Sequence, residues 1–405
     1  MRPDHDIVIV GGGPAGLAAA LFLARHAPAL AARTLVVERE RYPREKVCAG
    51  AIGARAERAL EAIGVHVDVP GARFDGALVT TGRGSVEARV GDVGRVVRRV
   101  EYDARLAEVA RARGVSIAEG VTVTGLETED PGGGVVLRTT AGPLRARAVV
   151  GADGVGSFVR RALGLRAARW RAQVVETDTA PIARDLDRSL LHFDISDPTL
   201  SGYVWHFPTI VDGQPLVCRG VYRLLLPGER ASEGDVGDRL DALLAARGLD
   251  PAEYAQKRFA ERGFHPHEPI ARGRTLLVGE AAGIDPVSGE GIAQAILYGR
   301  AAASYLAARL ESPAPSFDDW APYLRRTSLG RDLYVRHAIG RRLFGPARPS
   351  YERALCEVPG LADLALRYFG GLDVGRPALA RLGARLARHL WRERADRPLR
   401  PAPSL

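Results

Sequence analysis

A glycine-rich turn directly follows the first β-branched run of the chain. Residues 6–10 read DIVIV, and GGGPAG at residues 11–16 leads at once into an Ala- and Leu-rich stretch that ends near residue 25. A second apolar run, residues 34–37, ends in Glu38. A strand, a glycine turn, a helix and a second strand with an acidic end form a βαβ unit with an anion site at its helix N-terminus. This pattern restricts the first part of the chain to a parallel α/β sheet.

The spaced glycines of the turn have different expected roles. Gly11 permits the tight turn, Gly13 lets a pyrophosphate approach the backbone, and Gly16 allows the helix to pack closely on the strand. Glu38 can accept hydrogen bonds from a ribose diol, and its charge would repel a 2′-phosphate. The pattern therefore predicts a bound dinucleotide, disfavours NADP at this site, and does not separate NAD from FAD.

Length and composition exclude several classes of protein. The 405 residues predict two or three domains, and 46% hydrophobic with 26% charged residues is typical of a soluble globular protein. No apolar run reaches the roughly eighteen residues of a transmembrane helix, and the N-terminus leaves no room for a signal peptide. Three scattered cysteines indicate a reducing cytoplasm. The net charge of +9 is almost all arginine without interleaved aromatics, so we expect no nucleic-acid partner, and no residue spacing indicates a metal site.

Two further strands end in a glycine-flanked acid. Residues 148–154 read AVVGADG, which places Asp153 at such an end. Residues 276–278 form an apolar run that ends in Gly279 and Glu280, and a Pro- and Gly-containing loop then opens into an apolar helix from about residue 293. On its own, the second stretch fits both an ordinary strand–helix connection and a site for an anionic or electron-rich ligand.

Four features occur in the order of a known flavoprotein core. GGGPAG with Glu38, Arg99 before a Tyr-Asp helix start, GADG at residues 151–154 and GEAAG at residues 279–283 together resemble the FAD-binding core of flavin monooxygenases and geranylgeranyl reductases. The resemblance covers roughly residues 1–310. It implies that the two later acidic segments flank the flavin, with Glu280 where the family usually carries aspartate.

Three more motifs resemble the geranylgeranyl reductase branch of this group A flavin monooxygenase-like superfamily. KVCAG at residues 46–50 is similar to its KxCGG segment, GYVWHFP at residues 202–208 to its YxWxFP strand, and DPVSGEGI at residues 285–292 to its flavin loop. The resemblance implies an FAD-dependent reductase of carbon–carbon double bonds in an isoprenoid or similar hydrophobic substrate. The alternative is an FAD-dependent monooxygenase, or less readily a halogenase, of an aromatic or polyketide natural product.

The resemblance assigns site residues to these motifs. The expected FAD contacts are Gly11, Gly13, Pro14, Ala15, Gly16, Glu38, Arg39, Lys46, Cys48, Ala49, Arg99, Val123, Asp153, Gly279, Glu280, Gly289, Gly291 and Ile292. The expected substrate contacts are Tyr203, Trp205, Phe207 and Pro286. The three aromatics alternate along a strand and so share one face, with His206 on the other. These side chains could form an aromatic wall against a hydrophobic substrate, or they could simply pack in the hydrophobic core.

Cys48, Tyr203 and Trp205 are the expected catalytic residues. Hydride from reduced FAD would reach one alkene carbon, and a nearby acid such as Cys48 would protonate the other. Lys46 could bias the thiol toward thiolate, whereas a small buried apolar side chain is the alternative reading of Cys48. NAD(P)H or a ferredoxin is the expected transient reductant. Glu290 is expected to orient the flavin loop through helix-terminal N–H groups or, less readily, to reach the substrate.

The motifs divide the chain into three expected parts. Residues 1–75, 96–165 and 270–312 would form a Rossmann-type FAD-binding domain of the glutathione-reductase-like or PHBH-like kind, within an α/β fold. Residues 76–95 and 166–269 would form an inserted mixed β-sheet substrate domain. Residues 313–405 would be helical, with helices near 318–326, 329–344, 351–367 and 377–394.

The last expected helix carries leucines at helical spacing among arginines, at Leu379, Leu382, Leu386 and Leu390. A helix packed on the protein with a solvated basic face explains this pattern. An interfacial helix that docks peripherally on an anionic membrane, where lipid-like substrates reside, also explains it.

Overall fold

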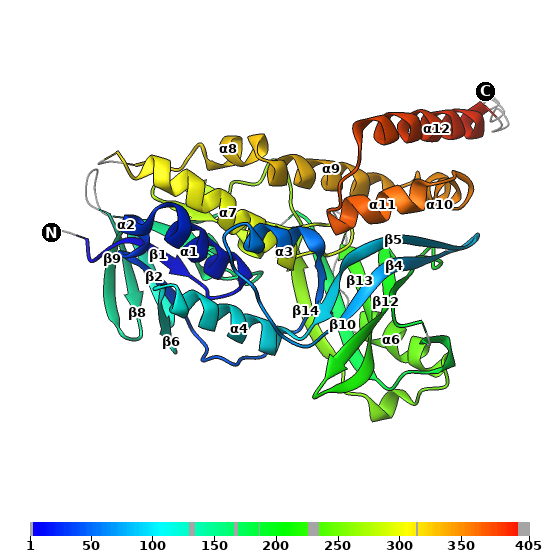
Figure 1. Ribbon diagram of the computed structural model, residues 1–405, viewed down its shortest axis with the longest axis horizontal. Helices are drawn as coiled ribbons and strands as arrows, with labels where there is room; N and C mark the ends of the chain where they lie inside the picture. Colours follow the sequence, from blue (N-terminus) through cyan, green and yellow to red (C-terminus); the bar gives the residue numbers. More distant parts are fainter. Residues whose placement is uncertain are drawn as a thin grey trace, which may run out of the picture.

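The computed structural model describes residues 3–128, 134–165, 169–185, 187–225, 235–312 and 315–395. Within these residues, two eight-stranded sheets stand side by side, and the C-terminal helices run along one side of both (Figure 1). The expected α/β fold, with a Rossmann-type part, a second mixed sheet and C-terminal helices, is confirmed.

The first sheet has the order β15-β16-β9-β1-β2-β6. Its strands are β1 (His5–Val10), β2 (Thr34–Glu38), β6 (Ser116–Glu119), β9 (Gly142–Gly151), β15 (Ala271–Arg272) and β16 (Thr275–Leu277). Neighbours from β16 to β6 pair in parallel, which brings the carboxyl ends of β1, β2, β9 and β16 to one edge. The antiparallel pair β7 (Val123–Thr128) and β8 (Val135–Thr139) extends this sheet. Residues 129–133, which connect the two strands, lie outside the described residues.

Helices α1 (Pro14–His26) and α7 (Ile292–Arg309) pack tightly against each other beside this sheet. Their close crossing depends on small side chains: a Cβ added to Gly299 would lie 2.5 Å from the backbone nitrogen of Ala19. Both helices begin at the edge where the parallel strands end, so their N-termini face the same region. The remaining helices of this part are α2 (Pro28–Ala31), α3 (Ala54–Glu61), α4 (Arg99–Ala112) and α5 (Phe158–Ala162).

The second sheet has the order β14-β10-β13-β12-β11-β4-β5-β3 and is antiparallel except where β11 pairs with β4. Its strands are β3 (Ala51–Gly53), β4 (Gly71–Thr81), β5 (Gly84–Val97), β10 (Arg171–Thr179), β11 (Leu190–Asp194), β12 (Gly202–Val211), β13 (Gln214–Leu225) and β14 (Lys257–Arg262). Helix α6 (Asp235–Ala245) covers one face of it through Leu240 and Leu244. β3 and the start of β4 thus belong to this sheet, although the sequence division places residues 1–75 with the nucleotide-binding part. The division into three domains remains a prediction.

The C-terminal region consists of α8 (Trp320–Arg326), α9 (Ser328–Leu343), α10 (Arg348–Glu357), α11 (Leu361–Gly370) and α12 (Arg376–Ala395). The expectation of one helix over residues 351–367 is wrong, because Pro359 and Gly360 separate α10 from α11. Gly360 takes a left-handed conformation with φ of 80°, which an α-helix does not continue through. Across the described residues, no helix is long and apolar enough to cross a membrane.

Candidate active site

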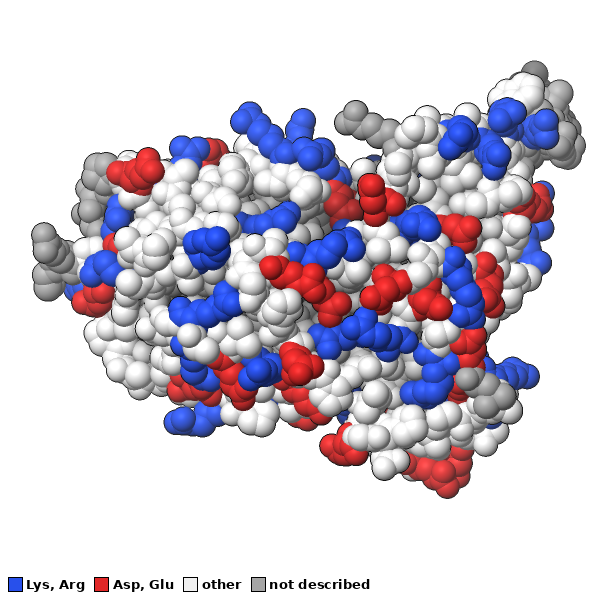
Figure 2. Space-filling view, in the orientation of Figure 1, with Lys and Arg blue, Asp and Glu red and all other residues white. Residues whose placement is uncertain are grey.

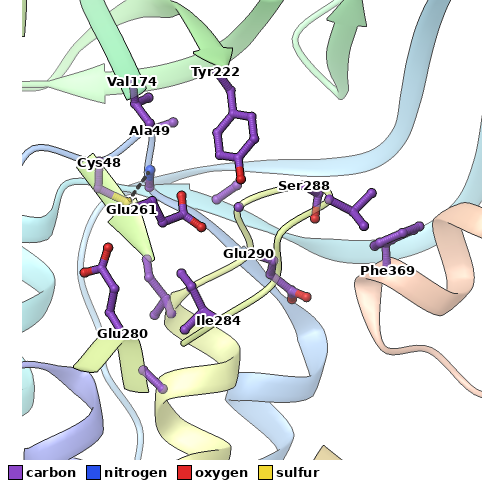
Figure 3. Close-up of a pocket in the computed structure, with 18 of the residues that line it drawn as sticks. Cys48, Ala49, Val174, Tyr222, Glu261, Glu280, Ile284, Ser288, Glu290 and Phe369 are labelled. Atoms are coloured by element: carbon purple, nitrogen blue, oxygen red, sulfur yellow. Dashed lines mark hydrogen bonds between the residues drawn. The ribbon is translucent and has the colours of Figure 1, made fainter. Parts of the chain in front are cut away.

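One large cavity, of about 1160 Å³, is lined by residues of both sheets and of the C-terminal helices. The glycine turn after β1 lines one part of it, and the loop of residues 44–50 and the loop of residues 284–291 line its middle. The face of the second sheet that is not covered by α6 and apolar side chains of α9, α11 and α12 line the rest. Figure 3 shows its middle part.

The glycine turn leaves the N-terminus of α1 open to the cavity. Gly11 has φ of 107°, and a Cβ there would lie 2.4 Å from the carbonyl oxygen of Ala152. Gly13 is the N-cap of α1 and lines the cavity with Pro14 and Ala15, so no side chain caps the first N–H groups. Gly16 lies outside the lining, and a Cβ there would lie 2.0 Å from the carbonyl oxygen of Gly11. An uncapped helix N-terminus of this shape fits a pyrophosphate.

Glu38 is fixed at the end of β2 beside this turn. Its Oε2 accepts a hydrogen bond from the Gly12 nitrogen at 2.8 Å, and its Oε1 accepts one from the Glu40 nitrogen at 3.0 Å. Arg39 and Val123, which were expected near the cofactor, also line the cavity here. A buried carboxylate at this position fits a ribose diol.

Arg99 is held rigidly at the start of α4. Its Nε and Nη2 each donate to Asp103 at 2.7 Å, which makes a bidentate pair inside the protein. Arg44 lies 3.2 Å from the same carboxylate and 3.5 Å from that of Glu38. The guanidinium groups of Arg44 and Arg99 therefore reach the cavity already paired with carboxylates.

The two later acidic segments meet at the middle of the cavity. Asp153 Oδ1 accepts a hydrogen bond from Ser157 Oγ at 2.5 Å and its Oδ2 accepts one from the Val159 nitrogen, so it also orders the start of α5. Burial raises the pKa of the Asp153 carboxyl above its usual value. Burial likewise raises the pKa of Glu280, although Lys46, with its Nζ 4.0 Å from Glu280 Oε2, acts in the opposite direction. Gly279 lies outside the lining and turns the chain there with φ of 59°.

The loop before α7 supplies a second uncapped helix N-terminus. Gly291 is the N-cap, and Gly289, Gly291 and Ile292 line the cavity. Asp285 folds this loop by accepting hydrogen bonds from the Val287 nitrogen at 2.8 Å and from Ser288 Oγ at 2.5 Å. The backbone N–H groups of Gly291 and Ile292 are thus presented without a side-chain cap, which fits an electron-rich ring or oxygen.

Glu290 does not have the role expected from the sequence. Its Oε2 lies 3.1 Å from Arg55 Nη2 and 3.0 Å from Arg336 Nη2, so it forms ion pairs, and no N–H group of the described residues donates a hydrogen bond to it. Arg336 also donates to Asp285 at 2.5 Å. These pairs tie the loop before α7 to α3 and α9, a long-range arrangement that the loop sequence alone does not indicate.

The aromatic side chains of β12 alternate as expected. Tyr203, Trp205 and Phe207 line the cavity, whereas His206 bonds to Arg219 and Arg247 on the other face of the sheet. All three aromatics are buried, so each serves the core as well as the cavity wall. The indole of Trp205 sits over Gly220 of β13, where an added Cβ would lie 2.2 Å from its ring.

Two tyrosines of the second sheet hold the loop before α7. Tyr203 donates from its hydroxyl to the Ser288 carbonyl at 2.7 Å, and Tyr222 stacks on Tyr203 with ring centroids 5.0 Å apart. Tyr222 donates at 3.4 Å to the carbonyl of Pro286. Pro286 itself lies outside the cavity lining, because its ring packs toward Gly263 behind the loop.

Cys48 lines the cavity next to Ala49, and its thiol is not activated as the sequence suggested. Burial raises the pKa of the Cys48 thiol, and the opposing effects of Arg99 and Lys46 are smaller. Its backbone nitrogen donates to Glu176 Oε1 at 3.1 Å, and its sulfur accepts from the Gly50 nitrogen at 3.4 Å. Lys46 is directed to Glu280 instead, so the thiol stays protonated at neutral pH.

Comparisons with known proteins agree with this geometry. A family described as an FAD binding domain matches residues 4–317. The geranylgeranyl diphosphate reductase of Rhodobacter capsulatus is 31% identical over 324 residues, which cover 77% of this chain and 77% of that protein. Digeranylgeranylglycerophospholipid reductase 1 of Methanococcoides burtonii is 30% identical over 307 residues, which cover 73% and 72%. The chain belongs to the geranylgeranyl reductase family.

Solved structures show how widely the fold of this geranylgeranyl reductase family member is shared. A geranylgeranyl bacteriochlorophyll reductase-like protein from Thermoplasma acidophilum matches with a TM-score of 0.77 at 21% identity, covering 97% of this chain and 98% of that one. p-Nitrophenol 4-monooxygenase from Pseudomonas putida matches with a TM-score of 0.68 at 22% identity, covering 91% and 97%. Both likenesses show the fold alone. The protein is an FAD-dependent oxidoreductase, and the reductases among its relatives favour reduction over monooxygenation.

Sequence motifs of the geranylgeranyl reductase family do not indicate one carboxyl of the cavity. Glu261, on β14, lines it beside Glu280 and Tyr222. Strand alternation would have placed Glu261 on the same face as Phe259, which also lines the cavity. However, the run KRFAER has charged residues on both faces, so its sequence does not indicate which face is buried.

Proposed function

We propose that this protein uses FAD to reduce carbon–carbon double bonds in a long apolar substrate of the isoprenoid type. The observation that carries the proposal is the continuity of the cavity. It extends from the glycine turn to apolar side chains of the C-terminal helices, among them Ile339, Leu343, Leu366 and Leu386. An apolar lining of this extent suits a flexible hydrocarbon chain better than a compact aromatic ring. The names of the two reductases above, both of which refer to geranylgeranyl compounds, support the same substrate class.

In this proposal the cofactor lies along the cavity from α1 to the loop before α7. The N-terminus of α1 would hold the pyrophosphate, Glu38 a ribose, and Asp153 with Glu280 the ribityl side. When bound and reduced, FAD supplies the hydride equivalent. Cys48, Gly291 and Ile292 would lie nearest the ring, together with Ala49 and Gly289.

The protein's own residues would position the substrate and keep water out. Trp205 and Phe207 give the substrate an apolar wall, and the hydroxyl of Tyr203 fixes the loop at Ser288. Because that hydroxyl is committed to a carbonyl, Tyr203 is a positioning residue in this proposal. Trp205 shapes the cavity wall and excludes water, and it transfers no proton.

The reductant in this proposal is NAD(P)H or a ferredoxin that docks transiently. The sequence has no second turn with the GxGxxG spacing of residues 11–16 that would hold a nicotinamide dinucleotide permanently. Mixing oxidised holoenzyme with NADH, NADPH or reduced ferredoxin and following flavin bleaching identifies the donor. Bleaching by none of the three contradicts this part of the proposal.

We place the protein in the cytoplasm, with α12 in peripheral contact with an anionic membrane. Leu379 and Trp391 on this helix are 45% and 71% exposed, and Leu379 also lines the cavity. The same helix carries exposed arginines, and Figure 2 shows this basic group over α12. They are Arg381, Arg385, Arg388 and Arg392. Leu382 packs against Ala354 and Val358, so one side of the helix packs on the protein while Trp391 and the arginines lie on exposed sides.

Product analysis tests the proposed reaction. Holoenzyme, its reductant and geranylgeranyl diphosphate are incubated without oxygen, and the lipid is analysed by mass spectrometry. We expect a gain of two hydrogens for each double bond that is reduced. Unchanged lipid, together with oxygen-dependent hydroxylation of an aromatic compound by the same preparation, would favour the monooxygenase alternative.

A further inference from the structure

We propose that Glu261 is the acid that delivers the proton to the substrate's double bond. The proposal rests on the reductase function proposed above. Glu261 is 5% exposed and lies on β14, and its carboxyl points into the space between Cys48, Glu280 and the loop that carries Ser288 (Figure 3). No motif considered above includes this residue.

The geometry leaves one oxygen of this carboxyl free for a ligand. Glu261 Oε1 is buried and has no hydrogen-bond partner among the described residues. The hydroxyls of two neighbouring tyrosines are already used, because Tyr203 donates to Ser288 and Tyr222 to Pro286. Burying a polar atom without a hydrogen-bond partner costs free energy. In a cavity, an atom of a bound substrate or cofactor can supply the missing partner.

The other oxygen lies against the loop before α7. A Cβ added to Gly289 would lie 3.0 Å from Glu261 Oε2, so the missing side chain of this glycine leaves room for the carboxyl. Gly289 belongs to the loop that ends at the uncapped N-terminus of α7. The acid therefore stands at the part of the cavity where the proposed function places the reacting ring.

The charges around Glu261 favour its neutral form. Glu280 from the turn after β16 and Asp285 from the loop before α7 are like-charged neighbours, whereas Tyr203 and Tyr222 are neutral. Burial, then Glu280 and Asp285, raise the pKa of Glu261 well above its usual value, and only Lys46 opposes them.

Two nearby cations are committed elsewhere. Lys46 pairs with Glu280 at 4.0 Å. Arg262, the next residue of β14, lies 3.5 Å from Glu268. These surroundings therefore favour the acid form of Glu261, which a proton donor requires.

The proposed step balances in atoms and electrons. The O–H bond of Glu261 breaks as a C–H bond forms at one alkene carbon, and the π electrons of the double bond make that new bond. The other carbon takes the hydride equivalent that reduced FAD supplies. The alkene is reduced by two hydrogens, the flavin is oxidised, and the Glu261 carboxylate then takes a proton from water. Glu280 and Lys46, whose side chains are 18% and 33% exposed, are charged neighbours of Glu261 and can pass that proton.

Glu261→Gln tests this role because it removes the proton and keeps the shape. Holoenzyme is reduced without oxygen, mixed with geranylgeranyl diphosphate, and followed by the return of the oxidised flavin spectrum. We expect the rate to fall by about 10²- to 10⁴-fold, the usual range for loss of a general acid. Glu261→Asp keeps an acid and should recover part of the rate with a shifted pH profile. Glu253→Gln, on an exposed turn, is the matched control and should leave the rate unchanged.

Infrared spectroscopy of the resting holoenzyme gives a readout that does not depend on turnover. Wild type at neutral pH should show the carbonyl stretch of protonated carboxylic acids, and Glu261→Gln should lose the part of this band that belongs to Glu261. An identical carboxylic-acid band in both proteins, or a rate within threefold of wild type in Glu261→Gln, overturns the inference. If wild type itself fails to reduce any polyprenyl compound, the proposed function fails and this role fails with it. An active wild type with an equally active Glu261→Gln overturns only the role of Glu261.

Discussion

At the scale of single residues, burial sets the chemistry of Cys48. The raised pKa of its thiol means that the reactive thiolate becomes populated only at more alkaline pH than for an ordinary cysteine. We expect iodoacetamide to alkylate Cys48 at neutral pH at least about tenfold more slowly than it alkylates glutathione, with the rate rising as pH increases. Peptide mass spectrometry of the holoenzyme measures this. Alkylation faster than that of glutathione would contradict this prediction and support the thiolate form of Cys48 that the sequence suggested.

Replacement of Cys48 by alanine distinguishes the role of Cys48 from that of Glu261. Because Glu261 supplies the proton in our account, Cys48→Ala should slow flavin reoxidation by substrate by less than about tenfold, well below the loss for a general acid. The same anaerobic mixing experiment measures both variants. A larger loss in Cys48→Ala than in Glu261→Gln would reverse the two roles.

Glu176 makes stability depend on pH. Burial, followed by Asp178, raises its pKa from 4.5 to about 7. The folded state therefore binds a proton that the unfolded state has already lost, so stability falls as pH rises from about 4.5 to about 7. At about 1.4 kcal/mol for each pKa unit, Glu176 lowers the free energy of unfolding by about 3 kcal/mol across this window.

Glu176→Gln should remove this part of the pH dependence. Glutamine keeps an oxygen that can accept the N–H of Cys48, so the loop at residues 44–50 should stay in place. Urea unfolding of wild type and variant at several pH values measures the difference, and Glu253→Gln is the exposed control. Parallel stability curves for wild type and Glu176→Gln would show that Glu176 titrates normally.

The residues that the sequence did not indicate share one property. Glu176, Glu261 and Arg336 are charged side chains that become buried only through contacts between segments far apart in the chain. Glu176 meets Cys48, and Arg336 meets Asp285, across long sequence separations. The local sequence pattern contains no signal for such long-range contacts. Gly11 and Gly13, in contrast, act within one turn, so their roles can be predicted from the sequence.

At the scale of elements, a buried cluster of charges fixes α9 to the loop before α7. Arg336 on α9 is fully buried and pairs with Asp285, Glu290 and Asp332, the last of which also pairs with Arg55 of α3 at 2.9 Å. Removing one partner of a buried pair leaves uncompensated charge, which costs about 3–5 kcal/mol.

Arg336→Met should therefore lower the free energy of unfolding by about that amount and loosen FAD, because the loop at Asp285 loses its anchor. Denaturant unfolding and the rate of flavin release measure the two effects. Arg342→Met, on an exposed position of the same helix, is the control. Addition of Asp285→Asn to Arg336→Met should recover part of the stability, and an unchanged double variant would argue against direct coupling of the two residues.

Helix α11 should set how long a substrate the cavity accepts. Ala365 lines the cavity on this helix, so Ala365→Trp would fill its distal part without touching the glycine turn. We expect turnover of geranylgeranyl compounds to fall at least about tenfold, as a filled pocket excludes the chain, while geranyl compounds keep most of theirs. Ala384→Trp, on the exposed face of α12, is the size-matched control. Equal losses for both chain lengths would show that α11 does not measure length.

Most elements were readable because local patterns and tertiary contacts agree for them. The βαβ unit from β1 to β2 and helices α8, α9 and α12 lie within a few residues of their expected bounds. The break between α10 and α11 could have been predicted, although our prediction was one continuous helix, because Pro359 and Gly360 are strong helix terminators. The assignment of residues 51–53 to the second sheet could not have been predicted, because a three-residue strand depends wholly on its partner β5.

At the scale of the whole molecule, the exposed apolar residues and arginines of α12 should bring the cavity to a lipid surface. Holoenzyme should sediment with vesicles that contain phosphatidylglycerol and fail to do so with vesicles of phosphatidylcholine alone, with binding weakened by salt. Leu379→Ser with Trp391→Ser should abolish sedimentation, whereas Val335→Ser, an exposed apolar residue of α9, should not. Equal sedimentation of wild type and the double variant would contradict a membrane role for α12.

The central claim is that the flavin and a long apolar chain share one cavity, in which a double bond is reduced. A single turnover without oxygen tests it most directly. Holoenzyme is reduced, freed of excess reductant, and mixed with geranylgeranyl diphosphate. The flavin absorbance spectrum is followed, and the mass of the lipid is measured by mass spectrometry. The account predicts reoxidation of the flavin with one double bond saturated for each flavin oxidised. Flavin that stays reduced until oxygen is admitted, with the lipid unchanged, would contradict it.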